Sequence, residues 1–323
     1  MLLAASGDRV AVVLQGGQGT GKSTMAKRIK GIIDPSAVAL LNSPRNIDDV
    51  ISAANNCHLL VYDNVSYITQ DMSDAFCIMC TGGSFAKRAL YSDDSRKAYR
   101  LDTPLMFTSI GEIVTKPDLL QRCLVITPRQ LTESERKSQS SMDRSFNCVR
   151  DSLLGGLLSI VSTAIQRLPH VQVTGLPRMT EFCRIGIAIE QTLGYEEGYF
   201  LCAYQRHITD RAEASFEQDD MCNSIIAVLT ARSNPMDKRV EGEFVGSMSE
   251  LMTEARKKRH NATTHYKSLH AFVKAFERAK PLLAQNGVIV KTLPRTGAKR
   301  LVSVTLKDRD SRVGPQMEED GSL

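Results

Sequence analysis

The sequence contains no tryptophan and no long apolar run. Aromatic residues make up 6% of the 323 residues, although 42% of the chain is hydrophobic. A membrane-spanning helix needs about 20 largely apolar residues, so we expect no membrane span. Removal of a signal peptide would also remove the strand before the first motif, so we expect none. These absences predict a cytoplasmic protein.

Cysteine patterns of disulfide-rich or zinc-binding proteins are also missing. Eight cysteines are scattered through mostly apolar surroundings. Cys77 and Cys80 have C-x-x-C spacing, but no second C-x-x-C or H-x-x-x-H accompanies them, which argues against zinc. We therefore expect reduced thiols buried in the core.

Charge is distributed unevenly along the chain. The net charge is +5, but residues 251–307 contain thirteen Lys/Arg and two Glu and so carry +11, which leaves −6 for the rest. A basic segment on an otherwise acidic chain predicts a polyanionic partner, with a solvated surface as the alternative.

A glycine-dense loop follows the first apolar run. Residues 10–14 (VAVVL) read as a buried strand, and the next residues, GGQGTGKS, fit G-x-x-x-x-G-K-[ST]. Glycines let backbone N–H groups approach phosphates, and the following helix adds its positive end. Lys22 is expected to contact the β- and γ-phosphates of ATP, and Ser23 to ligate Mg²⁺. The predicted nucleotide-binding residues are Gly16, Gly17, Gln18, Gly19, Thr20, Gly21, Lys22, Ser23 and Thr24.

Strand and helix patterns alternate through the first part of the chain. Strands are predicted at residues 10–14, 38–41, 58–62, 105–110 and 124–126, and helices at 22–33, 43–51 and 68–81. This alternation predicts an α/β fold with a parallel sheet. Residues 85–101 read as a β-hairpin or long turn, and helices follow at 146–168, 178–193 and 197–213.

The C-terminal part predicts a winged helix, a variant of the helix-turn-helix. Helices at 218–232, 249–259 and 266–284 precede two β runs, 288–293 and 300–306, joined by PRTGAK. The second helix of such a motif enters the major groove, whereas protein docking is the alternative. The predicted DNA contacts are Lys267, Lys274, Arg278 and Lys280 on the helix and Arg295, Lys299 and Arg300 on the wing.

Four regions result: a phosphate-loop core (1–140), a helical region (141–215), the winged helix (216–310) and a disordered tail (311–323).

Polar residues at strand ends are the candidate catalytic groups. Asp63 ends an apolar strand and can hold Mg²⁺ directly or through water. Asn64 follows it and cannot accept a proton, so either Asp63 is the general base or hydrolysis is slow. Thr108 or Ser109 is predicted to orient the attacking water, with a hydroxyl that satisfies its own backbone as the alternative.

The order of these segments resembles a known family. GGQGTGKST, AANNCHLLVYDNVSYI, CTGGSFAKRALYSDD, TPLMFTSI and PDLLQRCLVI resemble the AAA+ ATPase domain of phage and plasmid primase–helicase proteins, which are similar to superfamily 3 helicases. LPRMTEFCRIGIAIEQTLG and the basic C-terminal part also resemble that group. The resemblance implies an AAA+ fold, ATP hydrolysis, and a hexameric ring that threads nucleic acid through its centre.

The same resemblance implies further site residues. The hairpin would grip single-stranded or forked DNA through Lys87, Arg88, Arg96 and Lys97, although neighbouring aspartates also suit a solvated turn. Arg122 would act as an arginine finger on a neighbouring subunit's nucleotide, with an i−4 ion pair to Asp118 as the alternative. Two features depart from the family pattern. Thr108 stands where Asn is common. No primase domain precedes the ATPase region in this sequence, so priming is expected from another polypeptide or from a region that this sequence does not include.

Three functions remain open from the sequence. The first is a hexameric replicative helicase, which the hairpin and Arg122 favour. The second is a slowly hydrolysing, ATP-switched initiator, helicase loader or regulator, which Asn64 favours. The third is a small-molecule kinase, which would not need a basic winged helix.

Overall fold

The computed structural model describes residues 8–88, 96–232, 240–257, 268–294 and 301–307. The chain forms two compact units, Met1–Ile208 and Thr209–Leu323.

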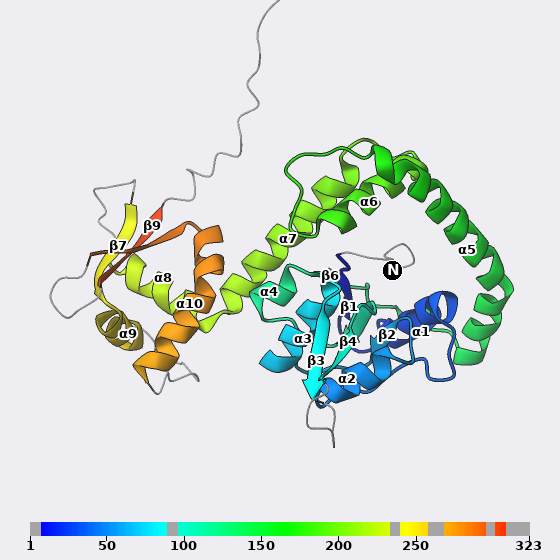
Figure 1. Ribbon diagram of the computed structural model, residues 1–323, viewed down its shortest axis with the longest axis horizontal. Coiled ribbons are helices and arrows are strands. Elements are labelled where there is room, and N and C mark those ends of the chain that lie inside the picture. The colour runs from blue at the N-terminus through cyan, green and yellow to red at the C-terminus, as the bar shows by residue number, and fades with distance from the viewer. Residues whose placement is uncertain (1–7, 89–95, 233–239, 258–267, 295–300, 308–323) are drawn as a thin grey trace, which may run out of the picture. The chain divides into compact units, whose positions relative to one another are not determined.

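A four-stranded parallel sheet lies at the centre of the first unit (Figure 1). Its strand order is β2-β5-β1-β6. The strands are β1 (Ala11–Gln15), β2 (Leu60–Tyr62), β5 (Leu105–Ser109) and β6 (Cys123–Ile126). Short apolar strands covered on both faces are typical of parallel sheets. The predicted α/β class with a parallel sheet is confirmed.

Helices cover both faces of this sheet. Alternate strand residues such as Leu14 and Met106 pack with α1 (Lys22–Ile33). The other set packs with α2 (Ile47–Ala54), α3 (Gln70–Cys80) and α4 (Pro117–Leu120). Because all four strands are parallel, their carboxyl ends lie at one edge of the sheet, where β1 leads into the glycine-rich loop.

Two predicted β segments differ from the central strands. Residues 38–41 do not form a strand, and only Leu41 makes an isolated parallel bridge, to Tyr62. Val38 is 57% exposed, so the start of this segment buries little apolar surface. β3 (Ser84–Arg88) and β4 (Arg96–Arg100) form a separate antiparallel pair, which confirms the hairpin.

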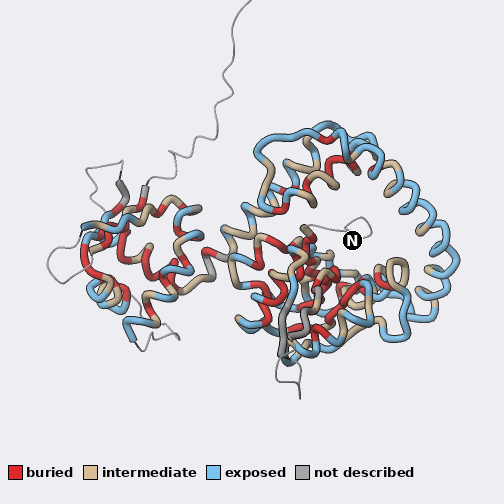
Figure 2. Tube along the Cα trace, viewed as in Figure 1, coloured by how far each residue is buried: buried red, intermediate tan, exposed pale blue. Residues whose placement is uncertain are grey.

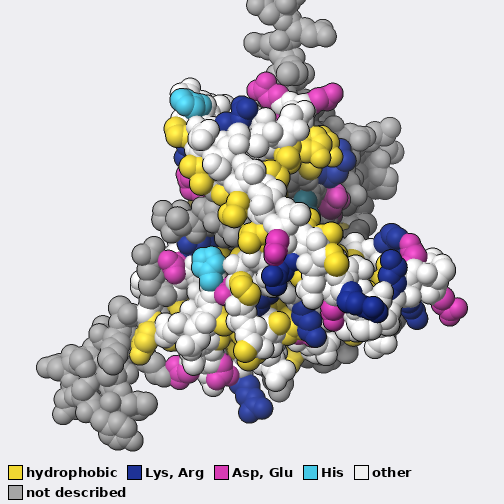
Figure 3. Space-filling model, turned by 90° about the vertical axis from the view of Figure 1, so that its right-hand side faces the viewer, with side chains coloured by type: hydrophobic (Ala, Val, Ile, Leu, Met, Phe, Trp, Pro, Cys, Tyr) yellow, Lys and Arg dark blue, Asp and Glu magenta, His cyan; other side chains and the backbone are white. Residues whose placement is uncertain are grey.

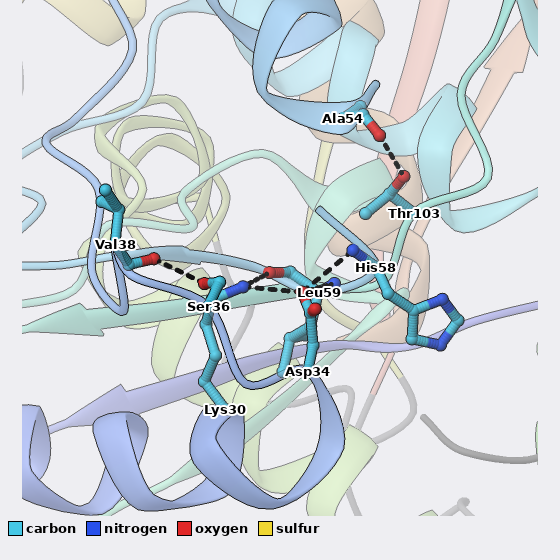
Figure 4. A network of polar contacts seen from close by, with 8 residues as sticks. All are labelled: Lys30, Asp34, Ser36, Val38, Ala54, His58, Leu59 and Thr103. Atoms are coloured by element: carbon cyan, nitrogen blue, oxygen red, sulfur yellow. Dashed lines mark hydrogen bonds and ion pairs between the residues drawn. The ribbon is translucent and has the colours of Figure 1, made fainter. Parts of the chain in front are cut away.

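A buried lysine connects the end of α1 to the start of β2 (Figure 4). Lys30 is 1% exposed, and its Nζ donates to Asp34 Oδ2 and to the carbonyl of Leu59, both at 2.7 Å. Asp34 also accepts from the backbone N–H groups of His58 and Leu59, each at 2.9 Å. A buried charge is tolerated when it is paired and hydrogen-bonded in this way.

Three longer helices follow, the last of which continues past the end of the first unit at Ile208. They are α5 (Gln139–Arg167), α6 (Thr180–Leu193) and α7 (Tyr199–Gln218), with short 3₁₀ turns at Glu133–Glu135 (η1) and Leu168–His170 (η2). α6 and α7 pack so closely that a β-carbon on Gly186 would lie 2.2 Å from the ring of Phe200. Glu190, 3% exposed, accepts from the N–H groups of Gly198 at 3.0 Å and Phe200 at 2.5 Å. A side chain of α6 thus caps the first turn of α7.

α5 is mostly exposed although it contains an apolar stretch (Figure 2). Near its start, Arg28 of α1 pairs with Asp143 at 3.5 Å and lies over the ring of Phe146. Farther along the helix, Val149, Leu153, Leu157, Leu158 and Ile165 are exposed. Hydrophobic side chains are scattered over the face of the molecule that Figure 3 shows.

Among the described residues, one helix, Gln139–His170, is long and apolar enough to cross a membrane, with 6% of its most apolar window buried. Length and composition alone do not establish a span, because core helices of soluble proteins pass the same test.

Five cysteines are buried as expected, namely Cys77, Cys80, Cys123, Cys183 and Cys222. The expectation was wrong for Cys148 and Cys202, which are exposed on α5 and α7, and Cys57 is half-buried. Burial raises the pKa of Cys77 to about 11 and of Cys80 to about 12. These two thiols are therefore uncharged at neutral pH and poorly reactive.

The second unit is smaller and is built around a three-stranded antiparallel sheet. Its elements follow the order α8 (Asp220–Thr230), β7 (Val240–Ser247), α9 (Met248–Lys257), α10 (Leu269–Gln285), β8 (Val288–Thr292) and β9 (Leu301–Lys307). The sheet order is β7-β9-β8. Phe244, Phe272 and Phe276 lie in its core.

β7 lies in a segment for which no strand was predicted, because its glycines and glutamates have low strand propensity. A β-carbon on Gly242 would lie 1.9 Å from the carbonyl oxygen of Leu229, so the contact between β7 and α8 requires glycine there.

Candidate functional site

The glycine-rich loop lies between the end of β1 and the start of α1. The N–H of Gly16 donates to the carbonyl of Ser109 at 3.1 Å, which fixes the loop to β5. Gly19 and Gly21 have φ values of 80° and 77°, in the left-handed region that favours glycine. α1 starts after Gly21 without a side-chain cap. Its first N–H groups are therefore available to an anion.

The ammonium group of Lys22 is engaged within this loop. Its Nζ donates to the carbonyls of Gly16 at 2.7 Å and Gly17 at 2.6 Å, and to Thr20 Oγ1 at 3.2 Å. The positive charge therefore lies inside the curve of the loop.

Three predicted residues meet beside the loop. Asp63, just after β2, accepts from Ser23 Oγ of α1 at 2.8 Å and from Thr108 Oγ1 of β5 at 2.6 Å, both through Oδ1. Elements separated by at least 40 residues thus place a carboxylate and two hydroxyls together. Oxygen donors of this kind suit Mg²⁺.

Thr108 bonds within the protein. It is 1% exposed, donates to Asp63, and accepts from the backbone N–H of Asn64 at 2.8 Å. These bonds orient the Asp63 carboxylate, and neither partner is the backbone of Thr108 itself. The role of Thr108 in orienting water stays a prediction. Ser109 is fully buried, and its Oγ has no hydrogen-bond partner among the described residues.

The backbone conformation at position 64 favours asparagine. Among the non-glycine residues that the structure describes, Asn64 is the one with a positive φ, at 52°. Asparagine is enriched in this left-handed region, whereas longer side chains adopt it at a cost. The side chain is exposed beside Asp63, in the position where the sequence raised the question of the general base.

Arg122 is turned into the protein. It is 8% exposed, and its Nη2 lies 3.5 Å from Asp118 Oδ1, the i−4 pair that was the alternative to an arginine finger. Its carbonyl accepts from Ala11 N–H at 2.9 Å, so it lies at the sheet edge opposite the loop. The arginine-finger role stays a prediction.

Arg178, which the sequence analysis missed, shares Asp118. It bonds Asp118 Oδ1 at 2.7 Å and Gln121 Oε1 at 3.0 Å, and its side chain is 47% exposed. Burial alone would raise the pKa of Asp118, but a hydrogen bond with Cys77 and the two guanidinium groups lower it. No local sequence signal links Arg178 to α4.

The predicted basic residues of the hairpin are paired across its strands. Lys87 lies opposite Lys97, and Arg88 lies opposite Arg96. The backbone therefore brings four basic residues together at the far end of the strands, and the segment 89–95 lies outside the described residues.

In the second unit, Lys274 and Arg278 are exposed one turn apart on α10. Neither side chain makes an ion pair within the described part of the chain. Lys280 bonds Glu277 at 2.6 Å. Lys267, Arg295, Lys299 and Arg300 lie outside the described residues.

A parallel α/β fold with a G-x-x-x-x-G-K-S loop after its first strand defines a class of phosphate-loop proteins. Within it, the chain belongs to the family of actinomycete integrative conjugative element replication proteins, whose sequence model matches residues 3–213. No curated protein matches the sequence.

Solved structures show distant likenesses. The C-terminal region of NrS-1 is 14% identical, with a TM-score of 0.38, and the match covers 93% of this chain and 68% of that one. A JCV helicase is 11% identical, with a TM-score of 0.31, and the match covers 64% of this chain and 57% of that one. The Aeropyrum pernix ORC1 protein, solved in complex with DNA, is 9% identical, with a TM-score of 0.27, and the match covers 93% and 84%. These likenesses are too distant to carry an argument about mechanism.

Proposed function

We propose that this replication protein is an ATP-hydrolysing motor of the AAA+ type that acts on DNA during replication of an integrative conjugative element. The observation that carries the proposal is the 2.8 Å bond between Ser23 of the loop and Asp63 at the end of β2. The order β2-β5-β1-β6, with the phosphate loop after β1, supports an AAA+ core. The ring, its six subunits and the use of DNA forks follow from the resemblance and are part of the proposal.

Ser23 and Asp63 fit a magnesium site, because a hydroxyl and a carboxylate oxygen lie together next to the loop. Bound Mg²⁺ would neutralise charge on the phosphates and help to hold them in line. Thr108 holds Asp63 in position from the other side. The loop and the free N-terminus of α1 bind and orient the phosphates.

Whether the site has an efficient general base distinguishes a fast-hydrolysing motor from a slowly hydrolysing, ATP-switched protein. Asn64 cannot take a proton, and the Asp63 carboxylate already accepts two hydroxyl hydrogen bonds. This arrangement favours slow hydrolysis, so a slowly hydrolysing initiator or helicase loader is the second candidate. Unwinding of forked DNA in the presence of ATP separates the two, because only a helicase unwinds without another motor.

We expect Asp63→Asn to lower the ATP hydrolysis rate by at least about 100-fold, or about 2.7 kcal/mol of transition-state stabilisation. The substitution keeps the shape of the side chain but removes the charge that would hold Mg²⁺. Steady-state phosphate release with single-stranded DNA measures the effect, and Asp71→Asn, at an exposed position on α3, is the matched control. Equal rates in both variants would contradict the role of Asp63.

The second unit supports a DNA-binding role. Three helices, a three-stranded sheet and the strand order β7-β9-β8 support a winged helix with α10 as the recognition helix. Lys274 and Arg278 project from its exposed side.

We expect the double variant Lys274→Ala/Arg278→Ala to flatten the salt dependence of DNA binding. Each lost phosphate contact reduces the slope of log K against log salt by about 0.9, so the double variant should lose about 1.8. Fluorescence anisotropy with a short duplex over a salt series measures this slope. Lys257→Ala on α9 is the control, because this exposed lysine already pairs with Glu254 and is not among the predicted DNA contacts. A double variant with the parental slope would show that α10 does not contact phosphates.

A further inference from the structure

The linker after β6 lies along the phosphate loop. A β-carbon on Gly16 would lie 3.7 Å from the carbonyl of Pro128, and one on Gly21 would lie 4.0 Å from Leu131 Cδ1. Between them, a β-carbon on Gly19 would lie 3.4 Å from Nη2 of Arg136. Residues 128–136 therefore form a second wall beside the whole loop.

The linker is held in shape by its own hydrogen bonds. Thr132 and Glu135 form a capping box around η1. Arg129 pairs with Glu135 through both guanidinium nitrogens, one of them at 2.8 Å. The hydrogen bond from Arg129, with those from Thr132, lowers the pKa of Glu135 to about 2. Glu135 is thus occupied by Arg129 and does not neutralise the next residue.

Arg136 is an uncompensated cation at the loop. It is exposed, and its guanidinium makes no ion pair or hydrogen bond to any residue that the structure describes. An unpaired guanidinium beside backbone N–H groups that attract anions is suited to phosphate, which it can bind in a bidentate manner.

We propose that Arg136 is a second cation of the nucleotide site, which acts in the same subunit and binds the phosphates of a nucleoside di- or triphosphate held by the loop. The inference rests on the proposed function and extends it. Lys22 contacts the phosphates from within the loop, and Arg136 contacts them from the linker wall. The linker leads directly into α5, so this contact connects the occupied site to the helical region.

The test is calorimetric titration of the full chain with ATP and Mg²⁺. Arg136→Ala should weaken ATP binding about tenfold, as expected for one lost charge-assisted contact, and Arg136→Lys should restore part of the affinity. Lys137→Ala, at the neighbouring exposed position, should stay within about twofold of the parent. The melting temperature without nucleotide should be unchanged in all three variants, because the side chains are exposed.

The outcomes separate this inference from the proposed function. If the parent binds ATP and Arg136→Ala binds it equally well, the inference is wrong and the proposed function stands. A parental chain that binds no ATP would overturn the proposed function and the inference with it.

Discussion

Replacing Lys22 by alanine is expected to weaken ATP binding by about 100-fold or more and to abolish hydrolysis. A lysine that contacts two phosphate groups makes two charge-assisted hydrogen bonds, each contributing about 1.5–3 kcal/mol. In the nucleotide-free loop the same ammonium is bonded to the carbonyls of Gly16 and Gly17. Nucleotide binding therefore exchanges neutral acceptors for charged ones, and this difference is lost in the variant.

Lys27→Ala is the matched control for that experiment, because Lys27 is an exposed lysine on the same helix. Equilibrium binding of ATP with Mg²⁺, followed by phosphate release, measures both steps. Tight ATP binding by Lys22→Ala would show that the loop does not hold the phosphates as we propose.

The second large effect is on folding. Lys30→Met should lower the free energy of unfolding of the first unit by about 3 kcal/mol, because it leaves Asp34 and the carbonyl of Leu59 without their buried partner. For a unit of this size, that change corresponds to a drop of about 6–12 °C in the melting temperature. Thermal unfolding followed by circular dichroism measures it, with Lys27→Met as the exposed control on the same helix.

The stability from this network should also depend on pH. Burial alone would raise the pKa of Asp34, but the bonds from Lys30, Leu59 and His58 lower it below its ordinary value. A lowered folded-state pKa means that the stabilisation is complete above the unfolded-state pKa of about 3.9 and is lost as the pH falls below it. The difference in stability between the parent and Asp34→Asn should therefore shrink below about pH 4. A constant difference down to lower pH would contradict this account.

The parts of the fold that the sequence predicted are those with local signals. β1, β2 and β5 are short apolar runs, and the phosphate loop has glycines at the positive-φ positions Gly19 and Gly21. β7 has no such signal, because its fit to α8 depends on the close approach of Gly242 to a distant backbone.

In the candidate site too, the residues with local sequence signals were predicted and the long-range contacts were not. Ser23 and Asp63 were predicted together because their spacing belongs to the loop motif and the strand that follows it. The bond from Thr108 to Asp63, the ion pair from Arg178 to Asp118 and the position of Arg136 beside Gly19 depend on contacts between elements far apart in the chain. Such contacts are set by packing, which no local pattern records.

The turn between α6 and α7 has a mechanical consequence. The ring of Phe200 occupies the space above Gly186, and the carboxylate of Glu190 holds the N–H groups of Gly198 and Phe200. Separating α6 from the start of α7 would leave the buried carboxylate of Glu190 without its hydrogen-bond donors. This cost makes the turn between the two helices rigid. The angle between α6 and the first turns of α7 is therefore expected to stay fixed when nucleotide binds.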